Sequence, residues 1–244
     1  MRTRFVVAGL LGLAMMGLVQ AQFGFGGRGG AGPLGLVNNK AVQEELKMSE
    51  EQISKLKDWA RDFMKTSFEM MKEEGVTFGK GGFGKLDEEM QAKIAAAQAK
   101  ITKEAYKQLA DVLKPEQIKR LKQIEIQQLG VRAFSTPEVV EALKLTDSQK
   151  ASVKGISGDL QKETREIFSE LGGGFGKGKF DFEKFNEANK KVQKLTKEYM
   201  SKIDEILDES QKKTWKELTG EAFDLSKLQP GFGGFGGFGK QKKD

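Results

Sequence analysis

One five-residue pattern recurs four times along the chain, and its spacing constrains the fold more than any other feature. The segment MSEEQ, which begins at Met48, is followed ninety-seven residues later by LTDSQ from Leu145. Two weaker copies, LKPEQ from Leu113 and LDESQ from Leu207, lie ninety-four residues apart. Repetition at a nearly fixed period is typical of chains built from repeated structural units. The spacing therefore predicts a tandem duplication of a unit of about a hundred residues.

The apolar residues within each unit predict helices. In the first unit they recur every three or four positions from Ile53 to Met71 and again from Met90 to Val112. The second unit repeats this from Val153 to Leu171 and from Phe185 to Ile206. That period fits an amphipathic helix and does not fit a strand. We therefore expect two long helices in each unit, each of about 25 residues, joined by a glycine-rich turn.

Shorter helices are expected on both sides of each long pair. They span residues 40–46 and 137–143 before the pairs, and residues 115–129 and 209–218 after them. Thr136 is expected to cap the second of these, because Pro137 suits the first helical position. The predicted fold class is therefore all-α, with elongated helical hairpins in two tandem units that form a cradle or bundle.

The recurring pattern also has the residues of a capping box. At such a helix start the cap side chain accepts the backbone N–H three residues on, and the Gln there accepts the N–H of the cap. Thr146 with Gln149 is the full example, Asp208 can cap the fourth copy, and Lys114 cannot cap the third. Helix initiation explains the pattern without any ligand. The capping residues are Met48, Ser49, Gln52, Leu113, Gln117, Leu145, Thr146, Gln149, Leu207, Asp208 and Gln211.

The composition excludes most catalytic chemistry. The chain contains no histidine and no cysteine, which removes disulfides, thiolate nucleophiles, imidazole bases and metal sites built on these residues. The carboxylates form no recognisable constellation, and the glycine patches lack the Gly-Lys-Ser/Thr ending of a phosphate loop. We therefore expect no enzyme, no catalytic residue, no cofactor and no metal site.

The first residues indicate the compartment. Arg2 and Arg4 precede an apolar run from Phe5 to Val19, and a small-residue cleavage site ends at Ala21. This is typical of a secretory signal peptide, and the run is shorter than the roughly 20 residues of a membrane span. The mature chain is expected in the periplasm or cell envelope without a transmembrane segment. The full chain has a formal charge of +6, from which removal of Arg2 and Arg4 leaves 39 basic and 35 acidic residues, or +4; Lys and Glu are interspersed, so nucleic acid is not an expected partner.

Four low-complexity patches combine Gly with Phe, over residues 23–30, 77–85, 172–180 and 231–240. Ordering so many glycines costs much backbone entropy, which favours flexible tails and hairpin turns. The alternative is that Phe23, Phe25, Phe232, Phe235 and Phe238 contact clients or envelope partners. The predicted organisation is a signal peptide (1–21), a Gly/Phe-rich flexible segment (22–35), two helical units (36–130 and 131–223) and a Gly/Phe-rich basic tail (224–244).

With these motifs the chain resembles the exported LTxxQ proteins of the Spy/CpxP type. Those proteins carry one LTxxQ near the start of a long helix and a second, often LTPEQ, near the end of the chain. Here each half contains such a pair, although Ser49, Lys114 and Asp208 replace Thr in three copies. The resemblance covers residues 36–220 and implies a bent helical hairpin that pairs into a cradle and binds partly unfolded proteins without ATP. Some members sense stress or metal, but metal sensing depends on His and Cys ligands, which this chain lacks.

The candidate client-binding residues are the apolar side chains in excess of what a two-helix seam needs. They are Trp59, Met64, Phe68, Met71, Phe168 and Phe182. Met and aromatic side chains suit promiscuous surfaces, because Met adapts its shape easily. The alternative is that these residues complete the core. Nearby lysines, such as Lys57, Lys65 and Lys72, could attract acidic clients.

Two functions compete on this evidence. The favoured one is an exported, ATP-independent chaperone-like protein that binds unfolded or partly folded proteins. The alternative is a non-enzymatic structural or stress-signalling adaptor that binds one specific protein, such as an envelope sensor. Promiscuity distinguishes them, because a chaperone suppresses the aggregation of several unrelated proteins and an adaptor captures one partner.

Overall fold

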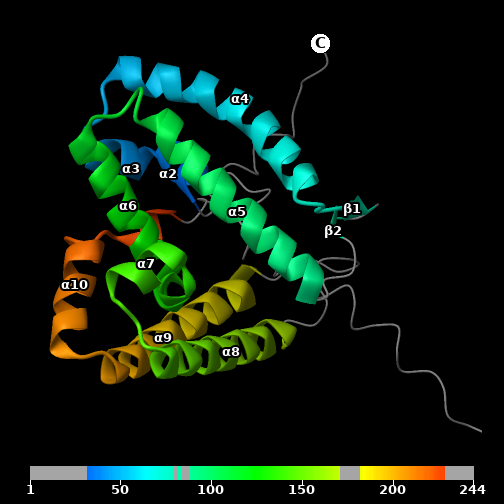
Figure 1. The fold of residues 1–244 in the computed structure, drawn as a ribbon, viewed down its shortest axis with the longest axis vertical. Coiled ribbons are helices and arrows are strands. Elements are labelled where there is room, and N and C mark those ends of the chain that lie inside the picture. The colour runs from blue at the N-terminus through cyan, green and yellow to red at the C-terminus, as the bar shows by residue number, and fades with distance from the viewer. Residues whose placement is uncertain (1–31, 80–81, 84–87, 171–181, 229–244) are drawn as a thin grey trace, which may run out of the picture. The chain divides into compact units, whose positions relative to one another are not determined.

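The structure is a computed structural model that describes residues 32–79, 82–83, 88–170 and 182–228. These residues form an all-α fold, as predicted (Figure 1). The helices are α2 (Pro33–Val37), α3 (Lys40–Glu45), α4 (Glu50–Glu73), α5 (Glu88–Leu109), α6 (Pro115–Leu129), α7 (Pro137–Ala142), α8 (Asp147–Ser169), α9 (Phe182–Ile206) and α10 (Glu209–Thr219). Two 3-10 helices, η1 (Gly130–Ser135) and η2 (Leu225–Leu228), and two short strands, β1 (Phe78–Gly79) and β2 (Gly82–Phe83), complete the described elements.

The described chain divides into two compact units. The α4 unit contains residues 32–78, 88–121 and 223–228, and the α8 unit is built mainly from residues 122–170 and 182–222. The division between Leu121 and Lys122 falls inside α6. This division reflects which residues contact each other in space, whereas the boundaries of the predicted units 36–130 and 131–223 reflect the repeat in the sequence. Those predicted limits, and the cradle, stay predictions.

The α4 unit is built on the hairpin of α4 and α5, which lie next to each other (Figure 1). Leu56, Phe63 and Met71 of α4 are buried at intervals of seven and eight residues, so one stripe of the helix faces the core. Ile94 and Leu109 of α5 are completely buried as well. The spacing of the apolar residues along α4 thus decides which face of the helix packs against the core and which face is exposed to solvent.

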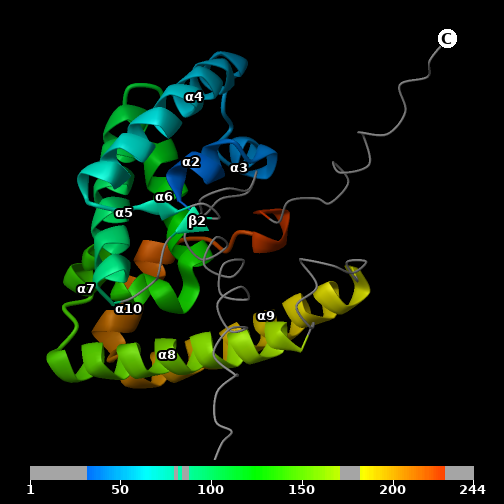
Figure 2. The same cartoon turned by 90° about the vertical axis from the view of Figure 1, so that its right-hand side faces the viewer.

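The α8 unit is built on the hairpin of α8 and α9, which run side by side in Figure 2. Its core joins Val153 of α8 and Tyr199 and Ile203 of α9 to η1 and α7. Phe134 of η1 is 1% exposed, and its ring centroid lies 4.2 Å from that of Trp215 in α10. The short elements therefore close one end of this hairpin.

The predicted boundaries of the two flexible tails are wrong where the tails meet the helical units. Residues 33–35 belong to α2, whose Leu36 and Val37 are buried, although the flexible segment was expected to reach residue 35. At the other end η2 forms, Leu228 is buried, and the Asn39 side-chain amide donates to the Lys227 carbonyl at 3.1 Å. A few apolar side chains next to the glycine patches find core positions, and burial outweighs the local entropy cost.

Two local predictions also need correction. Thr136 lies at the start of α7, but its hydroxyl donates to the Ala133 carbonyl at 2.7 Å and makes no cap bond. The preceding 3-10 helix η1 supplies that carbonyl. Because η1 is only six residues long, its sequence is too short to show a helical period that would predict it. In the first glycine-rich loop, β1 and β2 form a two-stranded sheet where only a turn was expected. The second such loop lies outside the described residues.

No helix within the described ranges has the length and the apolar character that a membrane span requires.

Candidate functional site

Complete capping boxes begin α4, α8 and α10. At α8 the Thr146 hydroxyl accepts the Gln149 backbone N–H at 3.2 Å, and the Gln149 side chain accepts the Thr146 backbone N–H at 3.0 Å. Ser49 and Asp208 take the place of Thr146 at the other two starts. Each box satisfies two of the backbone N–H groups that a helix start leaves without partners.

The third copy of the pattern, at α6, forms half of this arrangement. The Lys114 backbone N–H donates to the Gln117 side chain at 2.9 Å. A lysine side chain has no acceptor, so it cannot complete the box. The glutamine is therefore present at all four starts even where the cap is absent, which points to a second role for it.

That second role is pairing between the two copies of each half. Gln52 Nε2 donates to Gln117 Oε1 at 2.8 Å, and Gln117 Nε2 donates back to Gln52 Oε1 at 3.2 Å. The other N–H of Gln52 binds the Val112 carbonyl, and that of Gln117 binds the Leu46 carbonyl, both at 2.9 Å. We refer to Gln52 and Gln117 as the first glutamine clasp.

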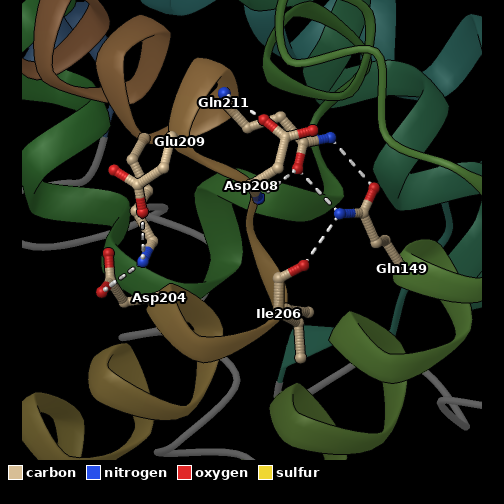
Figure 3. Close-up of polar contacts among 7 residues, drawn as sticks. Gln149, Asp204, Ile206, Asp208, Glu209 and Gln211 are labelled. Atoms are coloured by element: carbon tan, nitrogen blue, oxygen red, sulfur yellow. Dashed lines mark hydrogen bonds and ion pairs between the residues drawn. The ribbon is translucent and has the colours of Figure 1, made fainter.

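The second glutamine clasp, Gln149 and Gln211, repeats these contacts in the α8 unit (Figure 3). The reciprocal amide bonds measure 2.7 and 3.0 Å. Gln149 also donates to the Ile206 carbonyl at 2.8 Å, and Gln211 donates to the Leu143 carbonyl at 3.1 Å. Each clasp thus ties the start of a long helix to the end of its partner helix and to the short helix that follows.

Both clasps use the full capacity of the amide groups. A glutamine side chain offers two N–H donors and two acceptor lone pairs, and the capping and clasp bonds together occupy all four on each glutamine. Gln117 and Gln211 are each only 7% exposed. Buried polar groups destabilise a fold unless they are paired, and here the pairing is complete. The chemistry of the clasp is therefore structural locking.

Sequence reasoning assigned the glutamines to capping alone and missed the clasps. The partners lie 65 residues apart in the first half and 62 apart in the second, beyond the range of any helical period. The available signal was the recurrence of Gln where the cap residue is lost, at Gln117.

The lysines before the caps adopt left-handed backbone conformations, with φ of 49° at Lys47 and 50° at Lys144. Each ends a short helix in a Schellman motif, because Met48 N–H binds the Gln43 carbonyl at 3.0 Å and Leu145 N–H binds the Val140 carbonyl at 3.1 Å. The turn also presents the preceding leucine carbonyl to the clasp. Both strong copies of the pattern are therefore preceded by the same turn.

An open pocket of about 400 Å³ lies beside the first clasp. Lysines and carboxylates line it together, and Lys55 and Glu51 form an ion pair of 2.8 Å across its edge. Among the described residues, no group of three acidic, histidine or cysteine side chains is placed to hold a metal ion.

The candidate client-binding residues of α4 separate into two groups. Met64 is 51% exposed and Phe68 is 41% exposed, one helical turn apart. Met71 is completely buried, so the expectation that it lies on a client-binding surface was wrong. Trp59 is half-buried, stacks on Phe63 at 4.9 Å and donates its indole N–H to Gln108 of α5 at 2.9 Å, which makes it part of the hairpin packing.

The two candidates of the second half are placed differently. Phe168 near the end of α8 is half-buried, and its ring centroid lies 6.1 Å from that of Phe185 in α9. Phe182 is the first residue of α9, but its side chain lies outside the described part of the structure. The structure thus brings Phe168 into the α8 hairpin rather than onto an open surface.

We refer to Met64 and Phe68 as the apolar pair. Exposed basic residues border it at helical spacings of three, four and seven positions: Lys57, Arg61, Lys65 and Lys72. Arg61 and Lys65 each also approach an aspartate of the same helix, at 3.6 and 3.9 Å. The pair is therefore an apolar spot on a positively charged edge of α4.

The pKa of one tyrosine in the α8 hairpin is strongly raised. The Tyr199 hydroxyl donates to Glu163 at 2.6 Å, and this bond, together with burial, raises the pKa of Tyr199 to about 12. Burial alone lowers the pKa of Arg132 in η1. Both groups lie within the α8 unit.

Residues 37–125 match the family model described as LTXXQ motif family protein. The match over these residues confirms the resemblance to the LTxxQ proteins that was drawn from the pentapeptides. The matched range contains the MSEEQ and LKPEQ copies and ends before the LTDSQ copy. The tandem duplication of the unit therefore stays a hypothesis. No curated protein and no solved structure matches the chain in the corresponding comparisons.

Proposed function

We propose that this protein is an exported, ATP-independent chaperone-like protein that binds unfolded or partly folded proteins in the periplasm or cell envelope, and that it acts by binding and not by catalysis. The observation that carries the proposal is the apolar pair, Met64 and Phe68, exposed on a long helix. The match of residues 37–125 to the LTXXQ family model and the signal-peptide pattern of residues 1–21 support it.

The physical argument concerns the strength of the contact. Full burial of a Phe or Met side chain is worth about 1.5–3 kcal/mol, and each member of the pair is already about half covered. A client that covers both gains only a few kcal/mol from them. Weak contacts of this size release their ligands rapidly, so no nucleotide is needed to drive release.

The clasp makes the contact surface rigid. Gln52 in the first turn of α4 is held to Gln117 and to the Val112 carbonyl, and Leu56, Phe63 and Met71 fix the inner face of the helix. A preorganised surface loses little side-chain and backbone entropy on binding. The flexible partner in the complex is then the unfolded client, and Met64 can adapt to different client side chains.

Aggregation kinetics of several unrelated unfolded proteins, with and without the mature protein, test the proposal. Met64→Ser with Phe68→Ser should abolish most of the protection and lower the melting temperature less than the core control does, because the two side chains are only about half covered. Leu56→Ala is the core control and should cost about 2–5 kcal/mol. Protection should be the same with and without ATP.

The α8 hairpin offers a reciprocal test. Counting ninety-seven residues on from Met64 and Phe68 leads to Gln161 and Arg165, which are exposed polar residues. Gln161→Met with Arg165→Phe should add protection to a chain that already carries the serine pair. Unchanged protection in the serine variant would contradict the proposed site, and capture of one stoichiometric protein without any protection would instead establish an adaptor.

A further inference from the structure

The described chain ends beside the element that carries the apolar pair. Leu228, the last residue of η2, is 7% exposed, and the carbonyl of Lys227 accepts a hydrogen bond from Asn39, the cap of α3. Both η2 and α4 belong to the α4 unit. Residues 229–244 therefore leave from a fixed point on the unit that exposes Met64 and Phe68.

The residues that follow have a composition suited to the pair. The sequence from Gly231 to Gly239 is GFGGFGGFG, which places three Phe side chains at intervals of three and contains no charge. A Phe ring packs favourably against a Met sulfur and against another ring. The glycines let successive Phe side chains turn toward one surface, since glycine has few backbone restrictions.

The reach of this segment is sufficient. Eleven residues separate Lys227 from Phe238, and a chain of that length spans up to about 38 Å. Phe68 lies about 27 Å along α4 from its first residue, and only α3 and a short link separate Asn39 from that residue. A Gly-rich chain of this length samples distances of about 20 Å most often, so docking on the apolar pair uses the more extended conformations of the segment.

Charge favours one direction of docking. The segment ends with Lys240, Lys242 and Lys243. Glu69 and Glu73 are exposed in the last two turns of α4, where the helix dipole also attracts cations. A chain that runs from η2 toward the end of α4 brings its lysines beside these carboxylates. A second copy of α4 fits less well, because a twofold pair would place two basic edges next to the same apolar spot, whereas residues 231–239 carry no charge.

We propose that residues 231–239 dock on the apolar pair of their own chain and that clients displace them. This inference rests on the proposed function for the role of the client. Tethering gives the segment an effective concentration in the range of about a millimolar at the pair, so a weak contact becomes populated. The tail then lowers the apparent affinity for clients by the fraction of chains in which the pair is free.

Methyl spectra of the full mature chain labelled at the Met methyl carbons test the docking directly. Phe rings over Met64 shift its methyl resonance upfield, and Phe232→Ser with Phe235→Ser and Phe238→Ser should remove that shift. The matched control replaces Gly233, Gly236 and Gly239 with Ser, keeps every Phe and should retain the shift. The shift should not change on dilution, because the contact is within one chain. The Phe variant should also bind an unfolded model protein about threefold to tenfold more tightly.

The outcomes separate the two proposals. An identical Met64 resonance in the wild-type chain and the Phe variant overturns the docking, and the serine substitutions at Met64 and Phe68 still decide client binding. A Met64 resonance that moves only in the Phe variant, combined with no client protection by either chain, supports the docking and overturns the proposed function. A shift that disappears on dilution assigns the contact to a second chain and overturns the proposal as stated.

Discussion

The α4 and α8 hairpins begin alike and differ on their surfaces. Both start with a left-handed lysine, a capping box and a glutamine clasp with nearly equal distances. Yet α4 exposes Met64 and Phe68, and the positions that the repeat aligns with them in α8 carry Gln161 and Arg165. Among its described residues the α8 unit exposes no large apolar side chain. The pentapeptide therefore specifies how a hairpin starts and leaves its outer surface free to differ.

The helices of the two hairpins differ at other aligned positions as well. Gly155 and Gly158 of α8 face open space, and the aligned residues of α4 are Asp58 and Arg61. Tyr199 of α9 binds Glu163, and Ala105 stands at the aligned position in α5. The second hairpin therefore combines two weak helical positions with one partly buried, charge-assisted hydrogen bond. The predictions below test which of these features are shared and which are particular to one half.

The clasps should give the largest effects. Gln211→Ala removes both reciprocal bonds and leaves the Leu143 carbonyl and the Asp208 N–H without their partner. We expect a loss of about 3 kcal/mol in the free energy of unfolding, since each buried group left unsatisfied costs about 1–3 kcal/mol. Gln117→Ala should cost less, because the first clasp borders an open pocket through which water can enter. Urea unfolding of both variants measures the difference.

A double-mutant cycle then sharpens that result. Gln149→Ala combined with Gln211→Ala should cost less than the sum of the single changes, with a coupling of about 1–2 kcal/mol. Additive losses would mean that the two amides act independently and that the clasp is only a pair of caps.

High pH should weaken the α8 hairpin through Tyr199. Its pKa is about 10 in the unfolded chain and is raised to about 12 in the folded one, chiefly by the bond to Glu163. The stabilisation is therefore fully present below pH 10 and is lost as the pH rises toward 12. Denaturant titrations of the wild type and Tyr199→Phe at pH 8 to 12 measure the window; parallel curves across it would contradict the assignment.

The caps should give smaller, equal effects in both halves. Thr146→Ala and Ser49→Ala each remove one side-chain acceptor at a helix start, and a lost cap typically costs about 1 kcal/mol. Client protection should persist at temperatures where the variants stay folded. If protection vanishes while stability holds, the pentapeptide is a recognition element and not a structural one.

The glycines of α8 should give the smallest effect, and it is a gain. Both lie inside a helix, are exposed, and would place an added Cβ in open space. Gly155→Ala and Gly158→Ala should therefore each stabilise the protein by about 0.5–1 kcal/mol. Thermal unfolding measures the gain, and a loss would show that a partner surface covers this face in solution.

Local chemistry explains how much the sequence could predict. The four long helices follow from apolar spacing, and the starts of α4, α8 and α10 follow from a cap and a glutamine three residues apart. These are signals within one or two turns. The helices η1 and α2 are too short to show a period, and their order depends on burial of residues such as Phe134 and Val37.

The site was predictable only in part for a related reason. Helical spacing placed Met64, Phe68 and Met71 on neighbouring positions of α4, but the width of the buried stripe depends on how α5 packs against it. The structure buries Met71 and leaves the other two exposed. The clasps could not be found this way either, because pairing over more than sixty residues is decided by the fold and not by local pattern.

The aromatic packing described above gives each unit its own spectroscopic reporter. The chain has two tryptophans, and Trp59 stacks on Phe63 in the α4 unit while Trp215 packs on Phe134 in the α8 unit. A chain with Trp59→Phe therefore fluoresces from the second unit alone, and one with Trp215→Phe from the first. Coincident melting of the two signals would mark a single cooperative transition, and separated midpoints would let the loss of either clasp be assigned to the half in which it occurs.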